Sequence, residues 1–262
     1  MGKLDGKVAF ITGAARGQGR SHAVRLAEEG ADIIAVDICG QLQSVGYEMS
    51  TPSDLEQTVK EVEALGRRIV TKQADVRDYP ALKAALKEGI DELGPVEIVL
   101  ANAGIGPGGM ASNEQQWAEV IGVNLTGVWN TGRAAIPQMI KAKNGGAIVL
   151  TSSTGGLTGA PIDAAGMMAY TAAKHGVIGL TRSWANSLAP HFIRVNSVAP
   201  TTVRTPMAGG GNVAEIIENV PQLAGSLLNA IPVEAVDPID VSNAIAWLVS
   251  DEARYVTGSV IP

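Results

Sequence analysis

Short apolar runs alternate along the chain with longer segments whose apolar residues recur every three to four positions. The runs Lys7–Thr12 and Asp32–Asp37 are typical of buried strands, and residues 17–29 have the spacing of a helix with one apolar face. Ser53, with Glu56 three residues later, predicts the start of another helix through a capping box. Further strands are predicted at about 68–74, 96–101, 146–151 and 192–198, and further helices near 78–93, 114–141, 168–188 and 238–250.

This alternation predicts one α/β domain over residues 1–262, with a doubly wound parallel sheet and helices on both faces. Two segments are longer than ordinary connections, which span about 2–6 residues. Residues 38–52 follow the second strand, and residues 200–237 follow the sixth. Both lie at carboxyl ends of strands, where open α/β sheets bind ligands. We therefore expect 200–237 to shape a substrate site.

Composition excludes several classes of function. The chain has 262 residues, 20 of them basic and 26 acidic, for a net charge of −6. This acidic excess argues against a nucleic-acid partner or an anionic membrane. The N-terminus lacks the apolar region of a signal peptide, and no apolar run approaches the ~18 residues of a membrane span, so we expect a cytoplasmic protein. The single cysteine, Cys39, excludes an intrachain disulfide, and His22 and His175 have no third partner that would indicate a metal site.

The segment Thr12–Gly19 joins the first strand to the following helix and has the spacing G-x-x-x-G-x-G. Glycines there let the backbone approach a pyrophosphate, and the helix N-terminus offers free N–H groups and a positive dipole end. The segment therefore predicts a dinucleotide site. Its expected cofactor contacts are Gly13, Arg16, Gly17, Gln18 and Gly19.

Asp37 ends the second strand, 18 residues after Gly19. A carboxylate there can accept hydrogen bonds from both ribose hydroxyls of the adenosine half and repels a 2′-phosphate, which favours NAD over NADP. Arg16 leaves NADP as an alternative cofactor, because a nearby arginine can accommodate the 2′-phosphate. The next two strand ends predict further contacts with adenine and ribose, at Asp75, Val76, Asn102, Ala103 and Gly104.

Tyr170 and Lys174 are four residues apart on a predicted helix and therefore share one face. A free tyrosine, with a pKa of about 10, is a poor base at neutral pH, but a nearby ammonium favours its phenolate. Ser153, at the end of the fifth strand, can hydrogen-bond a substrate oxygen, and Asn124 is a polar residue among apolar neighbours. The four predict acid–base chemistry beside the dinucleotide site.

With these motifs the chain resembles the family of short-chain dehydrogenases/reductases over essentially its whole length. The matching segments are Thr12–Gly19, Asn102–Gly104, Asn124, Ser152–Ser153, Tyr170-x-x-x-Lys174 and Arg194–Pro200. The resemblance implies a Rossmann-type fold. It also implies a catalytic tetrad in which Tyr170 is the general acid/base and Ser153 orients the substrate oxygen. In the same tetrad, Lys174 binds the nicotinamide ribose and Asn124 holds a water of the proton relay.

The chain departs from the family pattern in three places. Thr201 stands where the family usually has a glycine after the proline. The resemblance still implies contacts at the nicotinamide end from Pro200, Thr202, Val203 and Thr205. Ser153 and Tyr170 are 17 residues apart, more than is typical, so we expect Gly159–Met168 to border the substrate. The chain stops at Gly258–Pro262, where the family normally continues, and we expect a truncated or partly ordered C-terminus.

The sequence Asp37-Ile38-Cys39-Gly40, followed by a long segment with Tyr47 and Met49, resembles the carveol dehydrogenase subgroup, which is associated with mycofactocin. The resemblance implies that 38–52 covers a bound NAD. The length of the segment and its start directly after Asp37 predict the same cover, and with it a slowly exchanging NAD that an external electron acceptor, mycofactocin, resets in place. A variable surface loop is the alternative.

The leading hypothesis is therefore an NAD-dependent oxidoreductase acting on a hydrophobic secondary alcohol or ketone. A ketoacyl or sugar-alcohol reductase of the same family, and a non-catalytic NAD-binding sensor, remain alternatives. The two long helices match those that usually pack against a symmetry mate in the family, and they carry more apolar surface than one sheet face needs, which predicts a homotetramer of D₂ symmetry. The residues counted for that surface are Trp117, Trp129, Val177, Leu180 and Trp184.

Overall fold

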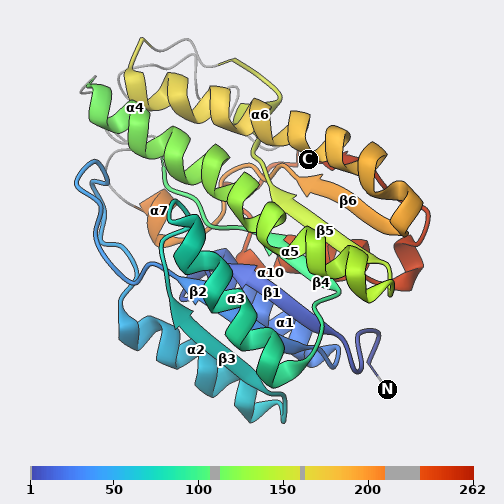
Figure 1. Ribbon diagram of the computed structural model, residues 1–262. Coiled ribbons are helices and arrows are strands. Elements are labelled where there is room, and N and C mark those ends of the chain that lie inside the picture. Colours follow the sequence, from blue (N-terminus) through green and yellow to red (C-terminus); the bar gives the residue numbers. More distant parts are fainter. Residues whose placement is uncertain (1, 107–112, 160–162, 210–230) are drawn as a thin grey trace.

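The computed structural model describes residues 2–106, 113–159, 163–209 and 231–262. It contains one sheet of seven parallel strands in the order β3-β2-β1-β4-β5-β6-β7 (Figure 1). The strands are β1 Val8–Thr12, β2 Asp32–Asp37, β3 Ile69–Gln73, β4 Ile98–Ala101, β5 Gly146–Thr151, β6 Ile193–Val198 and β7 Val260–Ile261. The predicted doubly wound parallel sheet is confirmed. The strand order reverses between β1 and β4, and this switch point is where such sheets bind dinucleotides.

The helices connect successive strands and cover both faces of the sheet. They are α1 Gly17–Glu28, α2 Pro52–Ala64, α3 Tyr79–Leu93, α4 Glu114–Ile121, α5 Val128–Ala142, α6 Ala165–Leu188, α7 Pro206–Gly209 and α10 Pro238–Val249. In the described ranges, no helix is long and apolar enough to cross a membrane. Residues 210–230 of the predicted substrate segment, and 160–162 of the predicted substrate border, lie outside the described residues.

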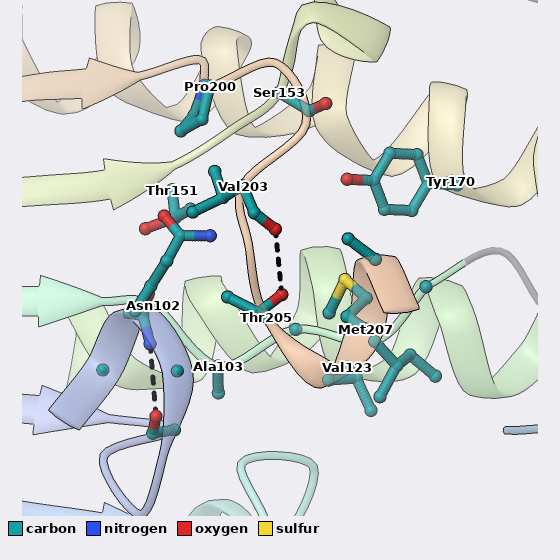
Figure 2. A pocket seen from close by; sticks show the side chains of 18 of the residues that line it. Asn102, Ala103, Val123, Thr151, Ser153, Tyr170, Pro200, Val203, Thr205 and Met207 are labelled. Carbon is teal, nitrogen blue, oxygen red and sulfur yellow. Dashed lines mark hydrogen bonds between the residues drawn. The ribbon is translucent and has the colours of Figure 1, made fainter. Parts of the chain in front are cut away.

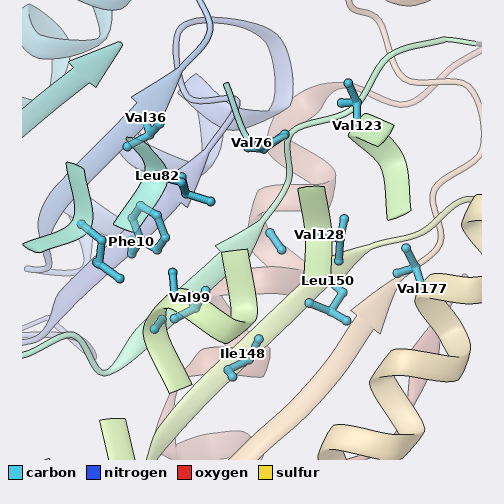
Figure 3. Close-up of a cluster of buried hydrophobic side chains, with 14 of the residues drawn as sticks. Phe10, Val36, Val76, Leu82, Val99, Val123, Val128, Ile148, Leu150 and Val177 are labelled. Carbon is cyan, nitrogen blue, oxygen red and sulfur yellow. The ribbon is translucent and has the colours of Figure 1, made fainter. Parts of the chain in front are cut away.

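Two apolar clusters, one on each face, hold the layers together because strand side chains alternate between the faces. In the first cluster, Phe10 and Ile148 of the sheet pack with side chains of α3, α5 and α6 (Figure 3). In the second, Ile11 and Leu100 pack with side chains of α1, α2 and α10. Since β1 and β2 are buried at every position, their apolar runs have no solvent-facing side.

The helix predicted at 114–141 is interrupted. The π-helical segment Gly122–Gly127 separates α4 from α5, although α4, this segment and α5 follow one another without a loop (Figure 1). A π-helical turn inserts an extra residue into the helical ladder and often marks a functional site. Asn124 lies on this segment and is fully buried. The break therefore alters the direction in which Asn124 projects.

The cap predicted for α2 is wrong by two residues. Thr51, not Ser53, is the N-cap, and it forms a capping box with Asp54 rather than Glu56. Pro52 occupies the first turn, where its fixed φ suits a helix start and its missing N–H is not needed. The helix therefore begins directly after residue 51.

Part of the apolar surface expected to lie between subunits is buried inside the chain. Val177 is 0% exposed in the first cluster, and a Cβ built on Gly132 would meet the Trp184 ring at 2.2 Å. Counting Val177 as spare surface is therefore wrong, whereas Trp184 is partly buried, with its ring against Gly132. Trp117 and Trp129 are 44% and 42% exposed and do form apolar surface on the two helices. The D₂ tetramer stays a prediction.

Candidate active site

A pocket with a cavity volume of about 310 Å³ lies at the carboxyl ends of the strands. All residues predicted to contact the cofactor line it. They are Gly13, Arg16, Gly17, Gln18, Gly19, Asp37, Asp75, Val76, Asn102, Ala103, Gly104, Tyr170, Lys174, Pro200, Thr202, Val203 and Thr205. Ser153 lines it as well, whereas Asn124 does not. Figure 2 shows how β4, β5 and the segment after β6 direct their terminal residues into one space.

The glycine loop is closely packed and suited to a pyrophosphate. Gly13 and Gly17 have φ of +68° and +55°, which favours glycine. A Cβ on Gly13 would lie 2.8 Å from Cα of Ala103, and one on Gly19 would lie 1.9 Å from the Gly13 carbonyl oxygen. The N-cap residue Arg16 gives no side-chain hydrogen bond to the first turn of α1. The helix N-terminus therefore faces the pocket without a side-chain cap, as an anion site requires.

Asp37 is buried at the end of β2 and accepts three hydrogen bonds. Its donors are the N–H of Ala15 at 2.9 Å, the N–H of Cys39 at 3.0 Å and the hydroxyl of Ser50 at 2.5 Å. Cys39, two residues after Asp37, has φ +44°, in the left-handed region, and its N–H donates back to the carboxylate. The carboxylate is therefore fixed in position at the pocket wall.

The next two strand ends are tied to their surroundings. Asn102 donates from its side chain to the carbonyl oxygens of Thr12 and Gly13, at 3.0 and 3.3 Å, which joins β4 to the glycine loop. Asp75 forms an ion pair with Arg77 at 2.6 Å. Both side chains line the pocket while their main hydrogen bonds lie within the protein.

Ser153, Tyr170 and Lys174 gather at the other end of the pocket. The hydroxyls of Ser153 and Tyr170 point toward one another across the cavity (Figure 2). Burial raises the pKa of Tyr170, and the nearby Ser153 hydroxyl opposes that rise. The surrounding protein therefore favours the neutral phenol over the phenolate.

Lys174 lies deeper in the protein than Tyr170. Its Nζ is 5.6 Å from the centroid of the Tyr170 ring. The ammonium donates to the carbonyl oxygen of Thr151 at 2.8 Å. Burial lowers the pKa of Lys174 to about 8, because removing the charged form from water is unfavourable. The lysine is thus held at the strand end that also carries Ser153.

Asn124 acts behind the pocket rather than in it. Its Oδ1 accepts from the N–H of Ile105 at 2.8 Å, and its Nδ2 donates to the carbonyl oxygen of Ile105 at 2.9 Å. These two bonds engage both ends of the amide. Within the described structure the side chain therefore fixes the segment after β4, and the water-holding role stays a prediction.

Residues 38–52 form an ordered segment with an internal hydrogen-bond centre. The side-chain amide of Gln41 donates to the carbonyl oxygens of Leu42, Val45 and Tyr47, and its Oε1 accepts from the N–H of Met49. Leu42 and Val45 are buried in the first apolar cluster. The segment is therefore folded rather than a loose connection.

The same segment is anchored to distant parts of the chain. Both the N–H and the hydroxyl of Ser44 donate to Glu119 on α4, at 3.2 and 2.5 Å. The hydroxyl of Tyr47 accepts from the N–H of Gly106 at 3.1 Å. In Figure 1 the segment extends from β2 toward α4. It thus connects the two halves of the sheet beside the pocket.

Arg16 belongs to this anchoring as well. Its guanidinium donates to the carbonyl oxygen of Glu48, within the 38–52 segment. Arg16, the residue that could accommodate the 2′-phosphate of NADP, is therefore hydrogen-bonded to the protein itself.

The apolar end of the pocket was predicted only in part: Met167 and Met207 lie in the segments expected to border the substrate, whereas Ile105 and Val123 were not assigned. This wall combines residues from five separate segments, Tyr47, Ile105, Val123, Met167 and Met207. A Cβ on Gly106 would lie 3.5 Å from the Tyr47 ring and 3.4 Å from Met207, so these two side chains meet around Gly106. In Figure 2, Met207 lies between Tyr170 and Val123. No local motif distinguishes these residues from ordinary core residues.

The histidines beside the motifs lie outside the pocket lining. His22 is fully buried on α1 with Nδ1 at 2.7 Å from the Ser242 hydroxyl, and burial lowers its pKa to about 3. Among the residues that the structure describes, no group of three His, Cys, Asp or Glu is placed to hold a metal.

Comparison with known proteins gives a consistent picture. The family model for short chain dehydrogenases matches residues 7–215. A (-)-trans-carveol dehydrogenase of Rhodococcus erythropolis is 47% identical over 273 residues, which cover 100% of this chain and 97% of the relative.

Two solved structures are similar over the whole chain. Carveol dehydrogenase from Mycobacterium avium in complex with NAD has a TM-score of 0.92 and 49% identity, covering 100% of this chain and 97% of that one. A short chain dehydrogenase from Mycobacterium paratuberculosis bound to NAD has a TM-score of 0.94 and 46% identity, with the same coverage.

Proposed function

The chain belongs to the short-chain dehydrogenase family, and we propose that it transfers a hydride between a hydrophobic secondary alcohol or ketone and NAD. One observation carries this proposal. Ser153, Tyr170 and Lys174 lie in the same pocket as a glycine loop and the carboxylate of Asp37. The resemblance to carveol dehydrogenases extends over the whole chain, and two similar structures, a carveol dehydrogenase and a short chain dehydrogenase, contain NAD.

The residues present fit NAD. The uncapped N-terminus of α1 suits the pyrophosphate, and Asp37 suits the adenosine ribose. Because Asp37 repels a 2′-phosphate and the Arg16 guanidinium is bonded to Glu48, the pocket favours NAD over NADP. When bound, NAD supplies a nicotinamide that takes up or returns a hydride.

In this mechanism the chain's own residues move and hold the proton. In alcohol oxidation, Tyr170 Oη takes the hydroxyl proton, and in ketone reduction it returns that proton. Ser153 Oγ hydrogen-bonds the substrate oxygen and Tyr170. The Lys174 ammonium stabilises the phenolate, which burial alone disfavours. Asn124 acts indirectly by fixing Ile105 and the segment after β4.

The apolar wall indicates the class of substrate. Val123, Met167 and Met207 offer methyl and thioether groups rather than hydrogen bonds to a substrate bound beside Tyr170. Such a wall favours a hydrophobic alcohol over a sugar alcohol, whose hydroxyls would lose water without replacement. A non-catalytic NAD sensor would have no need for the acid–base group at the cavity.

The anchored 38–52 segment supports a second part of the proposal, that NAD is held tightly and recycled in place, with mycofactocin as the external electron acceptor. Ile38, Tyr47 and Met49 line the cofactor pocket, and Ser44 is bonded to Glu119 on α4. Opening the segment requires these contacts to break, which slows dissociation more than association. We also propose that the protein forms a homotetramer and is located in the cytoplasm.

Two measurements test the proposal separately. A panel of secondary alcohols is added to purified protein, and the absorbance of reduced nicotinamide is followed in a single turnover. Reduction by hydrophobic alcohols and not by sugar alcohols is expected; absence of reduction by any alcohol would overturn the oxidoreductase assignment. Isotopically labelled NAD then measures cofactor exchange, which is expected to be slow. Exchange within seconds, with ordinary steady-state turnover, would refute the retained cofactor.

A matched pair of variants links slow exchange to the anchoring. Glu119→Ala removes the acceptor for Ser44 and should speed exchange. Glu114→Ala removes a carboxylate from the exposed side of the same helix and should leave exchange unchanged. Shortening residues 40–50 to a glycine-containing turn should speed exchange further without loss of the fold. Equal exchange rates in all variants would contradict the role of the segment.

A further inference from the structure

The carboxylate of Asp37 has fewer free acceptor positions than its place in the sequence suggests. Its Oδ1 accepts from both the Cys39 N–H and the Ser50 hydroxyl, and its Oδ2 accepts from the Ala15 N–H. A carboxylate offers about four acceptor positions, two on each oxygen. The three donors of the protein therefore leave one position, on Oδ2.

An adenosine ribose presents two hydroxyl donors to this corner of the pocket. One of them can use the remaining Oδ2 position of Asp37, and the other needs a different acceptor. Leaving it unpaired would be unfavourable, because a buried donor without a partner loses its hydrogen bond to water. The pocket therefore needs a second acceptor near Asp37.

Ser50 meets this requirement. Its hydroxyl gives its single proton to Asp37, so the two lone pairs of Oγ remain as acceptors. No described group donates a hydrogen bond to that oxygen. Ser50 is 8% exposed and lines the same pocket.

The backbone around Ser50 holds it in place. The next residue, Thr51, is the N-cap of α2 and is fixed by two bonds to Asp54. On its other side, the N–H of Met49 is bonded to Gln41. Ser50 is thus held between an ordered segment and a capped helix, as a binding residue requires.

Resting on the proposed function, we propose that Ser50 is a second ribose-binding residue. Its Oγ accepts a hydrogen bond from one adenosine ribose hydroxyl, and Asp37 Oδ2 accepts from the other. A phosphate ester on the ribose has no proton to give to either atom, and the negative charge of Asp37 repels it. Ser50 therefore adds to the preference for NAD. Because it belongs to the 38–52 segment, that segment recognises the cofactor as well as lying beside it.

The test compares NAD with two analogues that lack the 2′- or the 3′-hydroxyl of the adenosine ribose. Protein is incubated to equilibrium with an equimolar mixture of NAD and one analogue, and the bound cofactors are quantified by mass spectrometry. The wild-type chain should prefer NAD over each analogue by about fivefold, the effect of one hydrogen bond. In Ser50→Ala, the preference over one analogue should disappear and the preference over the other should remain.

The bound ratio is measured only on protein that is folded and loaded, so partial loss of folding does not bias it. Ser50→Thr keeps the hydroxyl and should keep both preferences. Ser53→Ala removes an exposed hydroxyl three residues away and should also keep both.

The outcomes are distinguishable. If Ser50→Ala leaves both preferences unchanged, or lowers both equally, Ser50 acts only through Asp37 and the inference is wrong while the proposed function stands. If the wild-type chain binds neither NAD nor the analogues, the proposed function itself fails.

Discussion

Replacing Lys174 by methionine should abolish a pH dependence of stability that burial of this lysine creates. In the folded chain the pKa of Lys174 falls from 10.5 to about 8, because its ammonium is buried beside the carbonyl oxygen of Thr151. The unfolded chain therefore carries one more proton than the folded chain between these two pH values. Stability must rise with pH through that window, since the unfolded state binds more protons.

The size of the effect follows from the same values. At ~1.4 kcal/mol per pH unit, a fall from 10.5 to about 8 amounts to about 3 kcal/mol. About 2 kcal/mol of this should appear between pH ~7.5 and ~9.5. Below about pH 8, Lys174 is charged in both the folded and the unfolded chain. The free energy of unfolding is then lowest, because folding has to bury the charged ammonium. The measurements stop below pH ~10, because burial raises the pKa of Tyr170 in the folded chain. At higher pH this tyrosine would ionise first in the unfolded chain, which would lower stability.

The assay is denaturant unfolding of cofactor-free protein, followed by tryptophan fluorescence at fixed protein concentration. Lys174→Met also removes the donor to Thr151, which lowers stability at every pH, so the slope with pH is compared rather than the absolute value. Lys141→Met, at an exposed position, controls for the loss of one positive charge. If wild type and Lys174→Met show parallel curves from pH ~7.5 to ~9.5, the lowered pKa is wrong.

Three further predictions concern chemistry, cofactor and assembly. Tyr170→Phe should lower turnover by at least ~10², the scale of general acid–base catalysis, while NAD still binds; near-normal turnover at saturating substrate would remove Tyr170 from the mechanism. Binding assays should show NAD favoured over NADP and a smaller gap in Asp37→Ala; equal Kd values in the wild-type chain would contradict the role of Asp37. Sedimentation at micromolar concentration should show a tetramer that Trp117→Glu or Trp129→Glu weakens, and a wild-type monomer would be incompatible with the predicted assembly.

Much of the fold could be predicted from the sequence because its signals are local. The apolar runs that became β1 and β2 have no polar face, so only a sheet covered on both sides can bury them. Parallel strands place all their carboxyl ends on one edge. The glycine loop and Asp37 follow successive strands and must therefore converge, although they are far apart in sequence.

The same reasoning fails where a partner is distant in sequence. The period of the helix from residue 114 gives no sign of the π-helical break at Gly122–Gly127, which changes the placement of Asn124. Val177 looks like surplus apolar surface until the sheet and helices are packed around it. At the start of α2, Thr51 and Ser53 are both acceptable caps, and the position of Pro52 favours the first.

The 38–52 segment shows most clearly which features the sequence predicts and which depend on the tertiary structure. Its length and position after Asp37 predicted a cover for the cofactor, and these are properties of the sequence. Its anchor on Glu119 and its donor to the carboxylate, Ser50, depend on tertiary structure, because a hydrogen bond of about 3 Å requires atoms that the sequence does not place together. The sequence by itself therefore determined the order of the elements and the chemical groups at the strand ends. Only the folded chain decided which of their acceptor positions remain free for a ligand.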